Sequence, residues 1–190
     1  LICYIYYPYR LIQFFTNLTL LATVVYLAIA VCAHYRNKWL TILALHHVWF
    51  EVMFMMNIIV VSVFWSSLYF EAIRECEGDP IKILNVYYAH ICPGVSALLC
   101  FMITDVTIRA SHVKIIVPIG VAYGFINYFE TKKRGKPLYW FLTWEDETSF
   151  IIYGGLIVVF SALWFGLSSF TLALKPRPAP KGSQKRSISP

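Results

Sequence analysis

A threonine and a histidine in separate apolar segments have the side chains needed for nucleophilic chemistry. Thr16 lies at the start of the first long apolar run, and His90 lies at the start of the third. A threonine hydroxyl attacks a carbonyl carbon only when a base removes its proton, and histidine suits that role near neutral pH. In the structural alternative, Thr16 hydrogen-bonds its own helix and His90 hydrogen-bonds a neighbouring carbonyl. Because the first and third spans run in the same direction, we expect the two side chains to lie at similar depth.

A second set of polar side chains is predicted at the opposite membrane face. It consists of His46, His47, Glu51 and Asp105. An acid at the centre of a bilayer costs roughly 2.5 to 3.5 kcal/mol on insertion scales, so Glu51 and Asp105 need partners such as His47 or Arg109. His47 and Glu51 are four residues apart and can touch on a helix.

This polar set has three interpretations. Paired structural charges are favoured, and a proton or ion path comes second. A metal site completed by His112 comes last, because imidazole and carboxylate suit zinc or iron but no known ligand pattern is completed. We therefore predict no metal and no cofactor.

The elements that position these residues are predicted to be membrane-spanning helices. Hydrophobic residues make up 59% of the 190-residue chain and charged residues only 14%, which is too apolar for a soluble domain. A hydrocarbon core of about 30 Å requires about 20 apolar residues per helix, and a helix satisfies its own backbone polar groups. We predict an all-α, polytopic transmembrane helical bundle with about five spans. The spans are 14–33, 47–69, 83–108, 115–129 and 150–174.

Close helix packing is predicted in the fourth span. Gly120 and Gly124 form a GxxxG pair. Lipid supplies no hydrophobic drive between helices, so close approach of backbones must supply the attraction. We expect this face to point into the bundle.

Outside the bundle of residues 14–174, the chain has an aromatic N-terminal flank, 1–13, and a basic, proline-rich tail, 175–190. The tail carries five Lys and Arg residues and no acid. Such a tail typically contacts anionic lipid head groups or an acidic partner, and no nucleic-acid-binding motif accompanies it. We expect membrane lipids and other membrane protein subunits as partners, and no nucleic acid.

Four short segments resemble, in the same order, those of a membrane-protein family. They are 14–16 (FFT), 63–69 (VFWSSLY), 90–93 (HICP) and 135–144 (GKPLYWFLTW). With them the chain resembles the androgen-induced-gene and ADTRP membrane proteins, whose wider relatives include the rolling-stone proteins. The likeness covers about residues 14–170. Family members usually have six helices, and those studied as enzymes hydrolyse ester bonds of branched hydroxy-fatty-acid lipids with a threonine nucleophile and a histidine. The resemblance implies Thr16 as nucleophile and His90 as its partner.

The chain also departs from that family. It has five predicted spans instead of six, and it lacks the second histidine and the threonine that flank the family's histidine. Tyr87, Ala89 and Ile91 lie near His90 instead. Our favoured interpretation is therefore a non-catalytic accessory or scaffold subunit of a larger membrane complex, which would suit the mitochondrial inner membrane. The alternative is an intramembrane hydrolase of fatty-acid ester lipids that uses Thr16 and His90, which would suit the endoplasmic reticulum or plasma membrane.

Overall fold

The computed structural model describes residues 14–36 and 39–174, and this part of the chain is helical with no strand. Five stretches are long and apolar enough to cross a membrane: Phe15–Tyr35, Leu40–Glu75, Pro80–Ile103, Ala110–Arg134 and Glu147–Leu174. The prediction of an all-α bundle with about five spans is confirmed, and these helices fit a multi-span integral membrane protein. The predicted flank, 1–13, and tail, 175–190, lie outside the described residues.

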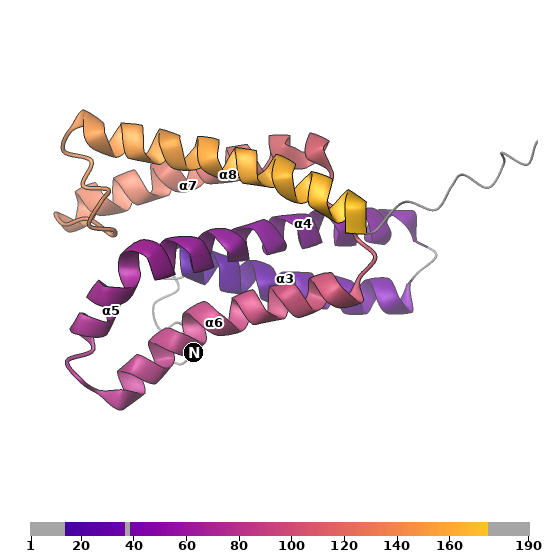
Figure 1. Cartoon of the computed structure of the whole chain (residues 1–190), viewed down its shortest axis with the longest axis horizontal. Helices are drawn as coiled ribbons and strands as arrows, with labels where there is room; N and C mark the ends of the chain where they lie inside the picture. The colour runs from indigo at the N-terminus through magenta and orange to yellow at the C-terminus, as the bar shows by residue number, and fades with distance from the viewer. Residues whose placement is uncertain (1–13, 37–38, 175–190) are drawn as a thin grey trace, which may run out of the picture.

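The helices form two groups. The first contains α3 (Phe15–Tyr35), α4 (Leu40–Val63) and α6 (Pro80–Ile103), with α4 packed against both neighbours. The second is the pair α7 (Val113–Arg134) and α8 (Glu147–Leu174), which lies over α4 in Figure 1. Residues 50–57 of α4 are all buried, as expected of a helix covered on every side. The core therefore runs along α4, where its side chains contact Tyr26 of α3 and Trp164 of α8.

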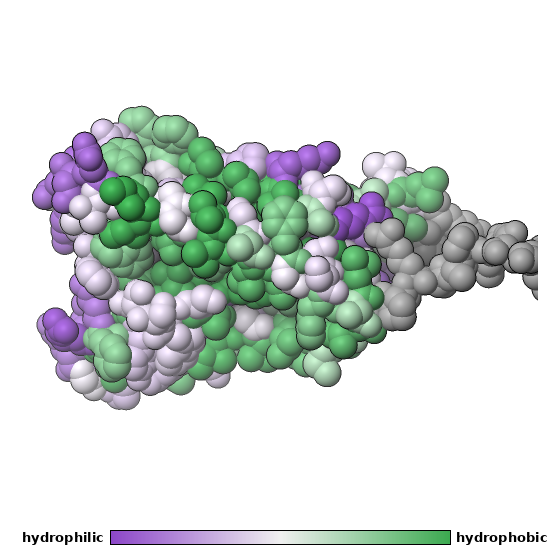
Figure 2. All heavy atoms as spheres, turned by 45° about the horizontal axis from the view of Figure 1, so that its top comes forward, coloured by the Kyte–Doolittle hydropathy of each residue, from purple (hydrophilic) through white to green (hydrophobic). Residues whose placement is uncertain are grey.

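The outward faces of the bundle are apolar. On α6, Leu98, Leu99 and Met102 are 54%, 55% and 70% exposed. Figure 2 shows a hydrophobic middle zone with the most hydrophilic residues gathered toward the two ends of the helices. Such a surface would be an aggregation hazard in water, whereas it matches the hydrocarbon core of a bilayer.

The third span is displaced relative to its prediction. Helix α6 begins at Pro80, where the Asp79 side chain accepts hydrogen bonds from the backbone N–H groups of Ile81 and Lys82. An acidic N-cap followed by proline is a strong start signal, and it moves the helix start ahead of the predicted residue 83. The helix ends at Ile103 rather than 108, because Thr104 has an extended backbone (φ −103°, ψ 147°). Asp105 therefore does not end the span, as predicted, but is exposed in the following loop.

Side chains of α8 hold the backbone that follows α6. Thr171 Oγ1 accepts from the Ile108 N–H at 3.0 Å, and Ser168 Oγ donates to the Ile108 carbonyl at 2.9 Å. Trp164 Nε1 donates to the Arg109 carbonyl at 3.1 Å. These tertiary partners take the place of helical hydrogen bonds for residues 108 and 109, which explains why an apolar run predicted as helix ends early.

The second and fourth spans are longer than predicted. Helix α4 continues through the π-helical turn η1 (Phe64–Leu68) into α5 (Tyr69–Glu75), so this stretch covers 40–75 instead of 47–69. The fourth covers 110–134 instead of 115–129. It includes the 3₁₀ turn η2 (Ala110–His112) at its start, and it ends at Gly135 in the left-handed conformation (φ 67°) that glycine adopts readily.

The GxxxG pair packs against α8. Tyr153 donates a hydrogen bond from its hydroxyl to the Gly120 carbonyl at 2.6 Å. A Cβ atom at Gly124 would lie 2.5 Å from Cε1 of the Tyr153 ring. The missing side chain at Gly124 therefore makes room for an aromatic ring at the α7–α8 contact.

Candidate active site

The structure brings Thr16 and His90 together. Thr16 is the second residue of α3, and its Oγ1 lies 3.4 Å from Nε2 of His90 on α6. His90 is well inside α6 rather than at its first turn, because α6 already begins at Pro80. A separation at the long end of hydrogen bonding is common for catalytic pairs without substrate.

The His90 ring is held by a hydrogen bond at one of its nitrogens and by an aromatic ring stacked on its face. Its Nδ1 lies 2.8 Å from the carbonyl oxygen of Val86, one turn earlier in α6. A carbonyl only accepts, so Nδ1 carries the ring hydrogen and the Nε2 lone pair faces Thr16. Phe64 stacks on the ring with centroids 3.6 Å apart and planes at 11°. Phe64 begins the π-helical turn, an element that often occurs at functional sites.

Two other threonines in α3 show what a purely structural hydroxyl does in this helix. Thr19 Oγ1 donates to the Phe15 carbonyl and Thr23 Oγ1 donates to the Thr19 carbonyl, both at 2.9 Å. Both residues are buried, and both bonds run to the preceding turn. Thr16 differs because its hydroxyl contacts a side chain of another helix.

Two tyrosines reach the start of α3 from the other helix group. The backbone N–H of Phe15 lies 3.0 Å from the hydroxyl of Tyr123 and 3.1 Å from that of Tyr139, and the two hydroxyls are 3.0 Å apart. Tyr139 lies in the connection between α7 and α8, and burial raises the pKa of its hydroxyl although its bonds to Tyr123 and Phe15 lower it. The Tyr139 hydroxyl therefore stays neutral at physiological pH.

Further hydrogen bonds anchor the connection that carries Tyr139. Trp140 Nε1 donates to the Ser67 carbonyl of the π-helical turn at 3.1 Å. Trp144 Nε1 donates to Asn127 Oδ1 at 2.6 Å, and Lys132 Nζ donates to the Trp144 carbonyl at 2.7 Å. The sequence analysis did not identify either Tyr123 or Tyr139 as a site residue. Tyr139 lies in segment 135–144, which resembles the membrane-protein family and could have drawn attention to it, whereas no sequence feature marked Tyr123.

Thr16 opens onto an apolar cavity between α4 and the α7–α8 pair. The cavity encloses about 940 Å³ of empty space, including the open space at its mouth. Its wall includes Phe15, Thr16, Tyr123 and Tyr139, whereas His90 is not part of it. No charged side chain lines it within the described residues. Its wall is almost entirely apolar, which suits a hydrocarbon chain.

The second predicted polar set divides in two. His47 Nε2 lies 3.2 Å from Oε1 of Glu51, as their spacing predicts, and Nδ1 of His112 contacts the other Glu51 oxygen. The predicted partner Arg109 also contacts Glu51, through its backbone N–H at 2.6 Å from Oε1. His46 instead faces the Tyr26 hydroxyl at 3.2 Å.

Asp105 is exposed and apart from this set, so the structure contradicts its predicted place at the end of a helix. The reason is the early end of α6, which leaves Asp105 on a loop.

The candidate active site is therefore defined by contacts within this chain. It combines a hydroxyl, an oriented imidazole, two neutral phenols and an apolar cavity. No protein-family model, curated protein or solved structure matches the chain.

Proposed function

We propose that this protein is an intramembrane hydrolase of apolar ester lipids, with Thr16 as nucleophile and His90 as general base. The observation that carries the proposal is the 3.4 Å separation between His90 Nε2 and the Oγ1 of Thr16, a residue that lines an apolar cavity. A nucleophile within reach of a base, a base oriented by a third group, and space for the reacting carbonyl are the geometric requirements for acyl transfer. The resemblance to the androgen-induced-gene and ADTRP proteins supports the same assignment.

The proposed reaction has two balanced steps. Thr16 Oγ1 attacks the ester carbonyl carbon while its proton passes to Nε2 of His90. The bond to the alcohol oxygen then breaks, His90 returns the proton to that oxygen, and the acyl group stays on Thr16. A water molecule attacks the acyl carbon in the second step, and its proton passes through His90 to the departing Thr16 oxygen, which releases the fatty acid.

The start of α3 offers stabilisation for the oxyanion. Tyr123 and Tyr139 line the same cavity as Thr16. When Tyr123 donates to Tyr139, the hydrogen of the Tyr139 hydroxyl is directed to another acceptor, because each phenol has a single hydrogen. The N-terminus of a helix adds positive partial charge. We assign Tyr139 as the donor to the developing negative charge.

The cavity supports a long-chain acyl group as the substrate portion that is recognised. Met56 and Ile59 of α4 face Ile116 of α7 and Phe160 of α8 across it. No charged residue lines the cavity among the residues described. A charged substrate group would therefore lose its water on entering and find no opposite charge to replace it. A neutral ester between two hydrocarbon portions is therefore the favoured class.

The test uses the full chain in lipid nanodiscs and a long-chain fatty-acid ester of a hydroxy fatty acid. Thr16→Ala is expected to lower the rate of ester hydrolysis by roughly 10³-fold or more, as loss of a nucleophile does elsewhere. Thr19→Ala is the matched control, since it removes a hydroxyl from the same helix one turn away. Hydrolysis that persists unchanged in Thr16→Ala would overturn the proposal.

The accessory-subunit role is the second candidate. The large apolar side chains exposed along α6 and α8 suit contacts with neighbouring membrane proteins as well as with lipid. Co-purification with other membrane chains in mild detergent, especially from mitochondrial inner membrane, would favour it. A lone monodisperse chain with hydrolytic activity, found in the endoplasmic reticulum or plasma membrane, would favour the hydrolase.

A further inference from the structure

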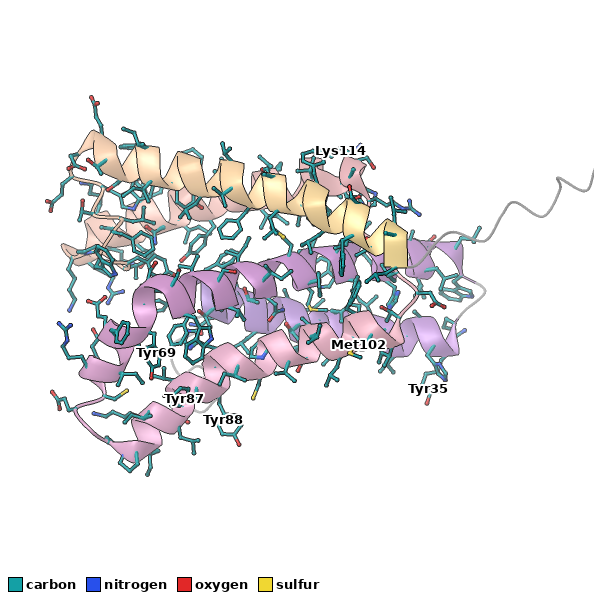
Figure 3. All side chains as sticks on the ribbon, viewed as in Figure 1. Tyr35, Tyr69, Tyr87, Tyr88, Met102 and Lys114 are labelled. Atoms are coloured by element: carbon teal, nitrogen blue, oxygen red, sulfur yellow. The ribbon has the colours of Figure 1, made fainter. Side chains whose placement is uncertain are left out.

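Three side chains of metal-binding type meet beside the middle of α4, away from Thr16, because α4 begins at Leu40, ahead of the predicted start of the span. His47 and Glu51 lie one turn apart on α4, and His112 ends the 3₁₀ turn η2. One ligand atom from each lies within 4.8 Å of the other two. In Figure 3, Lys114, two residues after His112, lies well away from Tyr69 and Tyr87 along the length of the bundle.

We propose that His47, Glu51 and His112 bind a divalent transition-metal ion, with Zn²⁺ as the favoured ion. Two imidazole nitrogens and one carboxylate oxygen form the ligand set of many three-ligand zinc sites and of facial iron sites, both of which leave a position for water. Zinc imposes no geometry of its own and accepts this set in a tetrahedral arrangement. The site lies outside the proposed ester-hydrolysing machinery and is independent of it.

The spacing and burial of the three side chains fit an ion. Ligands at about 2.0 to 2.2 Å from a tetrahedral zinc lie roughly 3.3 Å from one another. The distance of 3.2 Å between His47 Nε2 and Glu51 Oε1 already fits this value. Glu51 is 1% exposed, whereas the His47 and His112 side chains are 19% and 17% exposed. An ion would thus reach the buried Glu51 carboxylate past the partly exposed imidazoles of His47 and His112.

The surrounding backbone already orients the carboxylate. The Arg109 N–H donates to Glu51 Oε1 at 2.6 Å, and the Arg109 carbonyl accepts from Trp164 Nε1 at 3.1 Å. Metal ligands are commonly fixed by such hydrogen-bonding partners, whose loss lowers affinity. The connection between α6 and η2 is therefore held by α8 on one side and by Glu51 on the other.

Metal binding requires a change in the ring hydrogens. His47 Nε2 and His112 Nδ1 each face a carboxylate oxygen, which only accepts, so each of these nitrogens carries a hydrogen. When the ion binds, each hydrogen moves to the other ring nitrogen, or to water where the ring is an imidazolium. The Glu51 carboxylate then neutralises one of the two charges of the ion.

The ion would act as a clamp between the two helix groups. His47 and Glu51 belong to the group of α3, α4 and α6, and His112 immediately precedes α7. An ion that binds the folded chain and not the unfolded chain raises the stability of the fold. Zinc should therefore raise the melting temperature of the protein.

The experiment measures zinc binding and melting temperature on the full chain purified with a tag that contains no histidine. After chelator treatment and dialysis against Zn²⁺, the wild type should retain a single ion per chain and melt at a higher temperature than the chelated protein. His112→Ala and Glu51→Gln should each weaken zinc binding by at least about 10- to 100-fold. His46→Ala is the matched control, because this neighbouring histidine contacts Tyr26 and should leave zinc binding unchanged.

The outcomes separate a metal site from a hydrogen-bonded cluster. Wild type that retains no more zinc than His112→Ala, or His46→Ala that loses as much zinc as His112→Ala, overturns the proposal. If Glu51→Gln fails to fold, His112→Ala still decides, because this side chain lies near the surface. Thr16→Ala should bind zinc as the wild type does, so a failure of the metal site and a failure of the proposed hydrolase are distinguishable.

Discussion

Two regions of the bundle, one at the start of α3 and one beside the middle of α4, hold polar sets that are bonded in different ways. In the first, Thr16 Oγ1 and His90 Nε2 are 3.4 Å apart beside an apolar cavity. In the second, the buried acid Glu51 receives three hydrogen-bonding partners, the backbone N–H of Arg109 at 2.6 Å among them. Phe64, which stacks on His90, follows Glu51 by thirteen residues, or roughly 20 Å of helix.

The Thr16 hydroxyl is available to react, whereas the Glu51 carboxylate is held by several hydrogen bonds. A buried acid with several partners contributes to stability only while they stay in place, because removing one leaves another unpaired. A neutral hydroxyl beside an imidazole has no such cost and is available to a substrate. We therefore expect substitutions in the Thr16 region to change activity and substitutions in the Glu51 region to change stability.

His90→Ala should have the largest effect on activity. Removing a general base lowers rates by about 10² to 10⁴-fold, and we expect hydrolysis to fall within this range while the melting temperature changes little. Steady-state hydrolysis in nanodiscs measures the rate. His34→Ala is the control, since this histidine is exposed at the other end of α3. A wild-type kcat in His90→Ala would contradict the assignment of His90 as the general base.

Tyr139→Phe should come next. Loss of one oxyanion donor costs about 10² to 10³-fold in kcat, with little change in KM. Tyr35→Phe removes an exposed hydroxyl far from the cavity and should leave kcat unchanged. A Tyr139→Phe variant that raises KM alone would instead assign Tyr139 to substrate binding.

Glu51→Ala should lower the free energy of unfolding by about 1 to 3 kcal/mol, because it leaves buried hydrogen-bond donors without an acceptor. Asp105→Ala removes an exposed acid and should be close to neutral. Denaturant unfolding in detergent compares the two. Equal effects would contradict the assignment of Glu51 as the buried, bonded acid of this pair.

The pH dependence should be the smallest effect. Burial raises the pKa of Tyr139 above its ordinary value, so its hydroxyl keeps the proton as pH rises through that value. Activity should therefore show no loss from Tyr139 ionisation near pH 10, the ordinary pKa of tyrosine. A profile of kcat against pH in the wild type and Tyr139→Phe measures this. An alkaline loss that is present in the wild type and absent in the variant would contradict it.

Much of the fold follows from local properties that the sequence displays. Runs of about 20 apolar residues fix helices in a bilayer, and alternate spans must run in the same direction. The parallel direction of the first and third spans predicted a similar depth for Thr16 and His90, although the start of the third span was misplaced. The cap at Asp79 and Pro80 moved the helix start outward without changing which membrane face His90 approaches.

Other features depended on contacts that sequence patterns do not carry. The end of α6 at Ile103 reflects hydroxyl groups on α8 that bond Ile108 from 60 and 63 residues away in the chain. His46 and His47 are neighbours, yet successive residues on a helix point about 100° apart, and only His47 reaches Glu51. The role of Tyr123 required the packing of α7 against the start of α3.

The most direct test of the central claim is the detection of an acyl group on Thr16. The full chain is mixed with an activated long-chain ester, quenched rapidly and digested, and the peptide that contains Thr16 is analysed by mass spectrometry. We expect an acyl-Thr16 peptide in the wild type and its loss in His90→Ala. An acyl group carried by another residue, or the same acylation of Thr16 without His90, would contradict it.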